Sequence, residues 1–322
     1  MLTRRFLRIK VLQELYAFSR NRNDEYVDAE KALLTSLEKV YDLFIYQLSY
    51  ILEVSDFARK RIEDARNKFY PTQDDLNPNT KFIDNQVLSQ LSDNRSYKKH
   101  RDRLKINWAD QQDMLRKTYN ELRQSKSYKK YMESDRRSYT EDRDYLVRMV
   151  QDVILHDEYL QSFYEEKNVS WVNDFDASIV MLEKAFRGFK KDDDEYTPLP
   201  PLYIAPSEEN GRNEDEEFLK KLFRTVIFNA KDYDEMISER TENWDFDRIA
   251  VMDLLIIKMA VSEFLKFETI PIKVTMNEYI EISKVFSTPK SNIFVNGMLD
   301  KILSEFKDAG KIKKMGRGLI NN

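Results

Sequence analysis

Cysteine is absent from this chain of 322 residues, and histidine occurs only twice, at His100 and His156. The missing thiol excludes disulfides, thiolate zinc sites, iron–sulfur clusters and cysteine nucleophiles. Histidine is the usual general base and a frequent metal ligand, so its scarcity removes the other standard support for catalysis or metal binding. A chain without cysteine also suits a reducing compartment.

Glycine and proline are scarce as well, with 6 and 8 copies. The six glycines form neither G-x-x-x-x-G-K-[ST] nor G-x-G-x-x-G, so the two common backbone cradles for phosphate groups are missing. Few turn formers in a long chain disfavour a sandwich, a barrel or a Rossmann sheet. We therefore expect an all-α fold with long helices.

Long apolar runs free of charge are also missing. The most apolar stretch, residues 249–265, is interrupted by Asp253, Lys258 and Glu263, each costly at the centre of a bilayer. The first eight residues carry charge but not the apolar run that a secretory signal needs. These patterns predict a buried helix over 249–265, no membrane association and a cytoplasmic location.

Charge is abundant but segregated. Residues 95–137 hold 14 basic and 6 acidic side chains, whereas residues 141–217 hold 8 basic and 21 acidic ones. The basic stretch also contains five aromatic residues: Tyr97, Trp108, Tyr119, Tyr128 and Tyr131. Two interpretations stay open, because such segments either neutralise each other in the fold or form a nucleic-acid surface.

Proline, asparagine and aspartate concentrate at 71–78 and 197–211, which predicts two loops. Helical patterns cover 28–69, 82–130, 143–164 and 174–189. The chain also resembles itself at an offset of 73 and then 71 residues, which predicts a duplicated helical unit. The matched pairs are Tyr145-Leu146 with Phe218-Leu219, Val153-Ile154 with Val226-Ile227, Trp171 with Trp244, Asp174-Phe175-Asp176 with Asp245-Phe246-Asp247, and Val180-Met181 with Val251-Met252.

Three arginines, Arg4, Arg5 and Arg8, precede the apolar face of the first predicted helix. Cations in a first helical turn oppose the helix dipole by about 0.3–1 kcal/mol each. Something else must therefore favour them, and contact with phosphates is the specific hypothesis. A solvated basic helix end is the alternative.

The last predicted helix begins at Ser287-Thr288-Pro289, with proline at its first position, and runs to about Phe306. Its period separates an apolar stripe from a second face that carries Lys290, Phe294, Gly297 and Lys301. The stripe consists of Val295, Met298, Leu299, Ile302 and Phe306. An off-core phenylalanine between lysines could stack on an unpaired base, and Gly297 would admit a ligand or a crossing backbone. Packing against a neighbouring helix is the alternative for Phe294.

Two ends of the chain resemble the NusB family of transcription antitermination proteins. At the N-terminus the similar residues are Arg4-Arg5-Phe6-Leu7-Arg8 and Val11-Leu12-Gln13-Glu14-Leu15-Tyr16. At the C-terminus they are Ile270-Pro271-Ile272-Lys273-Val274, Asn277-Glu278 and Ser291-Asn292-Ile293-Phe294-Val295-Asn296-Gly297-Met298-Leu299-Asp300-Lys301. The resemblance covers roughly residues 1–35 and 213–306.

The resemblance implies an all-helical pair of small bundles without catalytic activity or cofactor. It implies binding of single-stranded boxA-type leader RNA together with NusE, a ribosomal protein, and delivery of that RNA to the RNA polymerase elongation complex. The residues that it assigns to RNA are Arg4, Arg5, Arg8, Lys290 and Phe294, and we add Lys301 because it shares their helix face.

The resemblance also divides the chain. Residues 1–35 would form an arginine-rich first helix, 36–212 a large helical insertion with a partial internal duplicate, 213–310 a C-terminal bundle and 311–322 a basic flexible tail. Residues 257–263 depart from the family pattern, with Lys258 for arginine and Ser262 for tyrosine, which puts contacts to NusE in doubt. Two alternatives remain: a helical scaffold that binds only protein, and the RNA-binding part of an rRNA methyltransferase system, which the missing cysteine disfavours.

Overall fold

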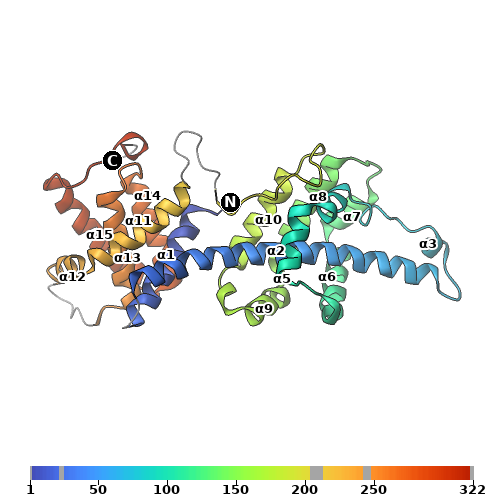
Figure 1. Cartoon of the computed structure of the whole chain (residues 1–322), viewed down its shortest axis with the longest axis horizontal. Coiled ribbons are helices and arrows are strands. Elements are labelled where there is room, and N and C mark those ends of the chain that lie inside the picture. Colours follow the sequence, from blue (N-terminus) through green and yellow to red (C-terminus); the bar gives the residue numbers. More distant parts are fainter. Residues whose placement is uncertain (1, 22–24, 204–212, 242–247, 320–322) are drawn as a thin grey trace. The chain divides into compact units, whose positions relative to one another are not determined.

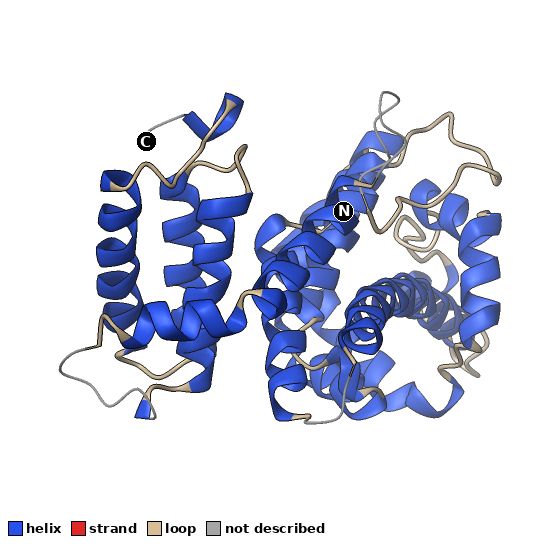
Figure 2. Cartoon of the chain, turned by 60° about the vertical axis from the view of Figure 1, so that its left-hand side comes forward, coloured by secondary structure: helices blue, strands red, loops and turns tan. Residues whose placement is uncertain are grey.

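The chain is helical throughout the part that the computed structural model describes, which is residues 2–21, 25–203, 213–241 and 248–319. Within these ranges the ribbon consists of helices and loops and contains no strand (Figure 2). The all-α prediction is therefore confirmed. Within the same ranges, no helix combines the length and the apolar character needed to cross a membrane.

The helices divide between two compact units. Of the described residues, the central unit contains Leu2 and 36–202, and the terminal unit contains those within 3–35 and 203–319. The labels in Figure 1 follow chain order. The helices are α1 (Arg4–Arg20), α2 (Tyr26–Arg66), α3 (Gln73–Leu76), α4 (Gln86–Asp93), α5 (Arg95–Leu104), α6 (Gln112–Gln124), α7 (Lys126–Glu133), α8 (Tyr139–Asp152), α9 (Glu158–Lys167), α10 (Phe175–Gly188), α11 (Glu214–Phe228), α12 (Ala230–Ser238), α13 (Val251–Lys266), α14 (Ile272–Phe286) and α15 (Ser291–Asp308).

Helix α13 is the core of the terminal unit. It packs against α1, α11, α14 and α15, and the ten consecutive residues from Leu255 to Phe264 are all buried. A helix that is apolar on every side has to be covered on every side, so the other helices gather around it. The prediction of a buried helix over 249–265 is confirmed in its helical part.

The central unit has an aromatic core on one side of α2. Tyr46 and Tyr50 of α2 lie within ring contact of Trp108, and Tyr46 also meets Trp171 and Tyr164. The indole N–H groups are satisfied, because Trp108 donates to the Ser49 hydroxyl at 2.9 Å and Trp171 donates to a backbone carbonyl of α2 at 2.8 Å. These large rings bury much area and hold this unit together, although the buried Tyr164 hydroxyl has no hydrogen-bond partner in the described part of the chain.

The predicted helical stretch 82–130 is broken into four helices by polar caps. Asn94 ends α4, and its side chain accepts from the amide of Tyr97 to begin α5. Lys105 then adopts a left-handed conformation, and the Ser125 hydroxyl accepts from the amide of Tyr128 to begin α7. Side-chain oxygens that satisfy the first free amides start new helices at these points, and a periodic pattern does not detect them.

The aromatic residues of the basic stretch are buried in this unit. Tyr119, for example, lies on the face of α6 that also buries Leu115 and Leu122, while Arg116 and Lys117 point outward. Rings in the core cannot stack on bases, so the aromatic part of the nucleic-acid interpretation is wrong for this stretch. Mutual neutralisation is limited as well: Arg95 pairs with Glu195 at 3.6 Å, but Arg103 pairs with Asp42, outside the acidic segment.

Candidate nucleic-acid interface

The N-terminal arginines are placed by the start of α1. The Thr3 hydroxyl accepts from the amide of Phe6 and caps the helix, which begins at Arg4. Leu7, Val11 and Leu15 are buried against α11 and α13, so the rotation of the helix is fixed. Arg4, Arg5 and Arg8 consequently emerge beside the N-terminal part of α11 and the facing ends of α13 and α14.

Each of these arginines meets a carboxylate in the terminal unit. Arg4 lies 3.2 Å from Asp215 and stacks over the Phe218 ring at 4.6 Å. Arg5 donates two hydrogen bonds to Glu278, at 3.0 and 2.9 Å. These acidic partners offset the cost of cations in the first turn, which was the electrostatic reason for expecting phosphate there.

Arg8 is the most deeply placed of the three. Its side chain is 3% exposed and donates two hydrogen bonds to Glu263, at 2.9 and 2.7 Å. Burial alone would lower the pKa of Arg8, but the hydrogen bonds and charge of Glu263 raise it above its usual value. Arg8 therefore stays charged and joins α1 to α13, a role different from the expected RNA contact.

Glu263 is the acceptor at the centre of this network and is completely buried. Besides Arg8, it accepts from the hydroxyls of Thr275 at 2.8 Å and Tyr279 at 3.0 Å. Burial, followed by the neighbouring Glu263 charge, raises the pKa of Tyr279 well above its usual value, so the phenol remains a donor. A buried charge with this many partners fixes α1, α13 and α14 relative to one another.

Arg4 and Arg5 remain partly open to solvent, with side chains 38% and 49% exposed. They line a groove of about 1240 Å³ in the terminal unit, with Phe218 and Phe267 among its walls. Two further cations line the same groove, Lys221 and Arg317. The sequence analysis missed both, because nothing in their local pattern places them beside α1.

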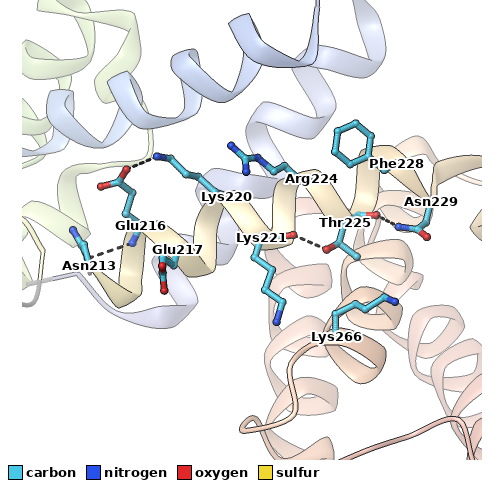
Figure 3. A pocket seen from close by; sticks show the side chains of 10 residues that line it. All are labelled: Asn213, Glu216, Glu217, Lys220, Lys221, Arg224, Thr225, Phe228, Asn229 and Lys266. Atoms are coloured by element: carbon cyan, nitrogen blue, oxygen red, sulfur yellow. Dashed lines mark hydrogen bonds and ion pairs between the residues drawn. The ribbon is translucent and has the colours of Figure 1, made fainter. Parts of the chain in front are cut away.

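A second groove of about 860 Å³ follows α11 (Figure 3). Figure 3 shows Lys221 and Lys266 on one side of α11 and the exposed ring of Phe228 on the other. Lys221 and Glu217 line both grooves, so the two grooves adjoin. Together the two linings hold eight basic residues against four acidic ones, Glu214, Glu216, Glu217 and Glu278. We call their cationic part the α11 surface and define it by Arg4, Arg5, Lys221, Lys266 and Arg317.

The C-terminal tail is docked where flexibility was expected. The Lys314 ammonium donates to the carbonyls of Glu263 and Phe267, at 3.2 and 2.8 Å. The Met315 amide donates to the Glu268 carbonyl at 3.0 Å. A Cβ atom on Gly318 would lie 1.9 Å from the Glu268 carbonyl oxygen, so only glycine permits this approach. The docked tail, described to residue 319, brings Arg317 to the groove.

Helix α15 presents the other predicted site residues. Its apolar stripe is buried as predicted, whereas Lys290 and Lys301 are exposed and Phe294 is half-buried. Beyond its own helical turns, a Cβ atom on Gly297 would meet no described atom within 4 Å, which excludes the close helix crossing and leaves room for a ligand. The helix begins at Ser291, two residues later than predicted, because Pro289 and Lys290 form a turn closed by the Ser291 amide, which donates to the Thr288 carbonyl at 2.9 Å. The Ser291 hydroxyl donates to buried Asp253 at 2.8 Å.

The arginines and Phe294 occupy different levels of the bundle. Ser291, at the start of α15, is anchored to Asp253, whereas Arg8 is anchored to Glu263. Ten residues of α13 separate these anchors, about 15 Å at 1.5 Å per residue. The structure thus brings Arg4, Arg5 and Arg8 together and sets the first turn of α15 apart from the anchor of Arg8 along α13.

These features define the class: an all-helical protein whose terminal unit presents a cationic, aromatic-lined surface suited to an anionic partner. Residues 189–304 match the model of the NusB family. The chain is 39% identical over 145 residues to "Transcription antitermination protein NusB" of Salinibacter ruber, covering 45% of this chain and 89% of that protein. The corresponding protein of Chloroherpeton thalassium is 38% identical over 118 residues, covering 37% of this chain and 56% of the relative.

Among solved structures, T. maritima NusB is 35% identical, with 31% of this chain and 70% of that chain covered, at a TM-score of 0.28. The similarity to the Salinibacter protein extends over nearly all of that relative. The chain belongs to the NusB family. The resemblance found from the two ends of the sequence is confirmed.

Proposed function

We propose that this chain is a non-enzymatic transcription antitermination factor that binds single-stranded boxA-type leader RNA. In this proposal a NusE-like ribosomal protein binds alongside the RNA, and the complex acts on the elongating RNA polymerase. The observation that carries the proposal is the similarity to relatives named transcription antitermination proteins, at 39% identity over 89% of one of them. In this proposal the α11 surface binds phosphate groups and the exposed face of α15 contacts bases.

Phosphate groups have a physically suitable destination on the α11 surface. Arg4 and Arg5 are exposed enough to exchange their carboxylate partners for phosphates, and Lys221 and Arg317 line the same groove. Each cation that neutralises a phosphate releases condensed counterions and adds affinity that does not depend on base sequence. Arg8 would act as a positioning residue, because it holds α1 in place through Glu263.

Bases have a candidate contact on α15. Phe294 is half-buried between exposed Lys290 and Lys301, and the open space above Gly297 lies one turn further along the same face. Base stacking on an aromatic ring beside cations is typical of single-strand recognition. We keep Lys290, Phe294 and Lys301 as proposed RNA contacts.

A helical scaffold that binds only protein is the second candidate. One observation favours it: all three N-terminal arginines already have carboxylate partners in the free chain. Salt dependence distinguishes the two functions, because binding through several phosphates weakens steeply as salt concentration rises.

The test measures binding of a labelled boxA-type RNA to the full chain, with and without the ribosomal protein, over a series of salt concentrations. Replacing Arg4 and Arg5 together by glutamine should reduce the slope of log affinity against log salt by about 1.4, since each single-strand phosphate contact contributes about 0.7. Replacing exposed Lys31 and Lys231 of the same unit by glutamine removes equal charge and serves as the control. Equal affinity for boxA-type and scrambled RNA would refute the proposed function.

A further inference from the structure

The central unit carries a cationic groove that the proposed function does not use. The groove, of about 490 Å³, lies between α7, the loop that follows it and the first turns of α8. Three exposed cations line it, Lys130, Arg136 and Arg148, and none of them forms an ion pair within the described ranges. Four serine and threonine residues line it as well: Ser127, Ser134, Ser138 and Thr140.

The two acidic residues in the lining are already engaged. Glu141 lies 3.1 Å from the ammonium of Lys81, which is 1% exposed, and Asp144 lies 3.2 Å from Arg143. Burial would raise the pKa of Glu141, but hydrogen bonds from Ser134 and Lys81, together with nearby cations, hold it below its usual range. The uncompensated charge of the groove is therefore positive.

The groove is formed in advance by a rigid framework. Lys81 donates to the Ser134 carbonyl at 2.9 Å and so fixes the loop after α7. The Tyr131 and Tyr145 rings are stacked at 4.0 Å, and the Tyr131 hydroxyl donates to Asp142 at 2.6 Å. A site whose walls are held in this way loses little conformational freedom when it binds a ligand.

The surface around the groove identifies the kind of anion. Four more exposed cations lie within a few turns, Arg123, Lys126, Lys129 and Arg137, against exposed Glu133 and Asp135. Between residues 77 and 158, all described, no large hydrophobic side chain is exposed. A membrane site would need apolar side chains to insert, and a base-reading site would need exposed rings. The ligand that fits the surface is therefore a chain of repeated phosphate groups.

We propose that the α7–α8 groove is a second RNA-binding site, which grips the sugar–phosphate backbone of single-stranded RNA without reading its bases. The choice of RNA as the anion rests on the proposed function, but the groove and its charge do not. Lys130, Arg136 and Arg148 pair with successive phosphates, and the hydroxyls donate to phosphate oxygens between them. The site adds affinity that is equal for all sequences.

The experiment measures binding of a labelled oligouridylate and of a boxA-type RNA to the full chain over a series of salt concentrations. In the groove variant, Lys130, Arg136 and Arg148 are all replaced by glutamine. Its slope of log affinity against log salt should fall by about 2, since each of three contacts to a single strand contributes about 0.7. Affinity for both RNAs should fall by the same factor, so the preference for boxA-type RNA is unchanged.

A matched variant replaces three other exposed cations of the central unit, Lys60, Arg61 and Arg116, by glutamine. It carries the same charge change and should keep the slope of the unmodified chain. Circular dichroism and thermal unfolding should be unchanged in both variants, because all six side chains are exposed. A groove variant with the slope of the matched variant would overturn the proposal.

Two further measurements distinguish this proposal from a membrane-binding groove and from the proposed function of the chain. Vesicles of phosphatidylserine and phosphatidylcholine should not bind the chain through this groove; vesicle binding lost in the groove variant, with RNA binding intact, would overturn the proposal in favour of a membrane site. If the unmodified chain does not prefer boxA-type over scrambled RNA, the proposed function fails. The proposal for the groove is then still tested by the slope of log affinity for oligouridylate against log salt.

Discussion

Replacing Arg8 tests whether its buried pair with Glu263 stabilises the fold. Replacing Arg8 by methionine keeps much of the apolar stem but leaves the Glu263 carboxylate, which is completely buried, with only the hydroxyls of Thr275 and Tyr279. Breaking a buried ion pair from one side costs about 3–5 kcal/mol. Because two donors remain, we expect a loss near the lower end, about 3 kcal/mol in the free energy of unfolding.

The assay is urea unfolding followed by far-ultraviolet circular dichroism. The chain has two compact units, so hydrogen exchange at the amides of α1 and α13 is needed to assign the weakened transition to the terminal unit. Arg5→Met is the control, since Arg5 binds Glu278 through two hydrogen bonds as well but is half exposed. An exposed pair contributes about 0–1 kcal/mol.

A loss below about 1 kcal/mol for Arg8→Met would refute the structural role, because that is the range of exposed pairs. An unchanged stability combined with weaker RNA binding would restore the original prediction that Arg8 contacts RNA. Adding Glu263→Gln to Arg8→Met removes the buried charge that lost its partner, so the double variant should recover part of the stability.

Three further substitutions have expected outcomes that follow from the structure. Phe294→Ala should weaken boxA-type RNA binding by about 1–3 kcal/mol, measured by fluorescence anisotropy; a fall in thermal stability with RNA affinity unchanged would make the ring a packing residue. Gly297→Ala should raise helix stability by about 0.5–1 kcal/mol, since the added methyl meets open space, and RNA affinity should fall only if the ligand approaches there. Gly318→Ala should release the tail, seen as faster exchange of the Met315 amide, because its Cβ would collide with the Glu268 carbonyl; unchanged exchange would show that the tail tolerates the methyl.

Local periodicity correctly predicted which face of a single helix is buried. The five residues of the α15 stripe are all buried, because a period of 3.6 residues places them on one side whatever the rest of the chain does. The predicted start of α15 was two residues early, because Pro289 and Lys290 form a separate turn, and the bond from Ser291 to Asp253 of α13 was not foreseen. A hydrogen bond between side chains of helices far apart in the chain has no signature in the local sequence.

The roles of the arginines depended on partners far away in the chain. Arg5 and Glu278 are 273 residues apart, and Arg8 and Glu263 are 255 apart. The sequence singled out the three cations correctly as locally unfavourable, but not the carboxylates that compensate them. Lys221 and Arg317 were missed for the same reason, since they reach the groove through α11 and a docked tail.

The two units share a plan that bears on what the extra helices do. Helices α8, α9 and α10 have 14, 10 and 14 residues, and α11, α12 and α13 have 15, 9 and 16; in each set the first packs against the third. The aligned residues Leu146 and Leu219 are both completely buried.

The duplication stays a prediction, and its Trp244 and residues 245–247 lie outside the described ranges. Both helices begin with acidic residues, Glu141 and Asp142 in α8 and residues 214–217 in α11, and the cations Arg136 and Arg137 lie in the loop before α8. Charge on an exposed surface contributes little to stability, so the loop cations are better explained by binding than by folding. Arg136 lines the α7–α8 groove, where the proposal places phosphate contacts.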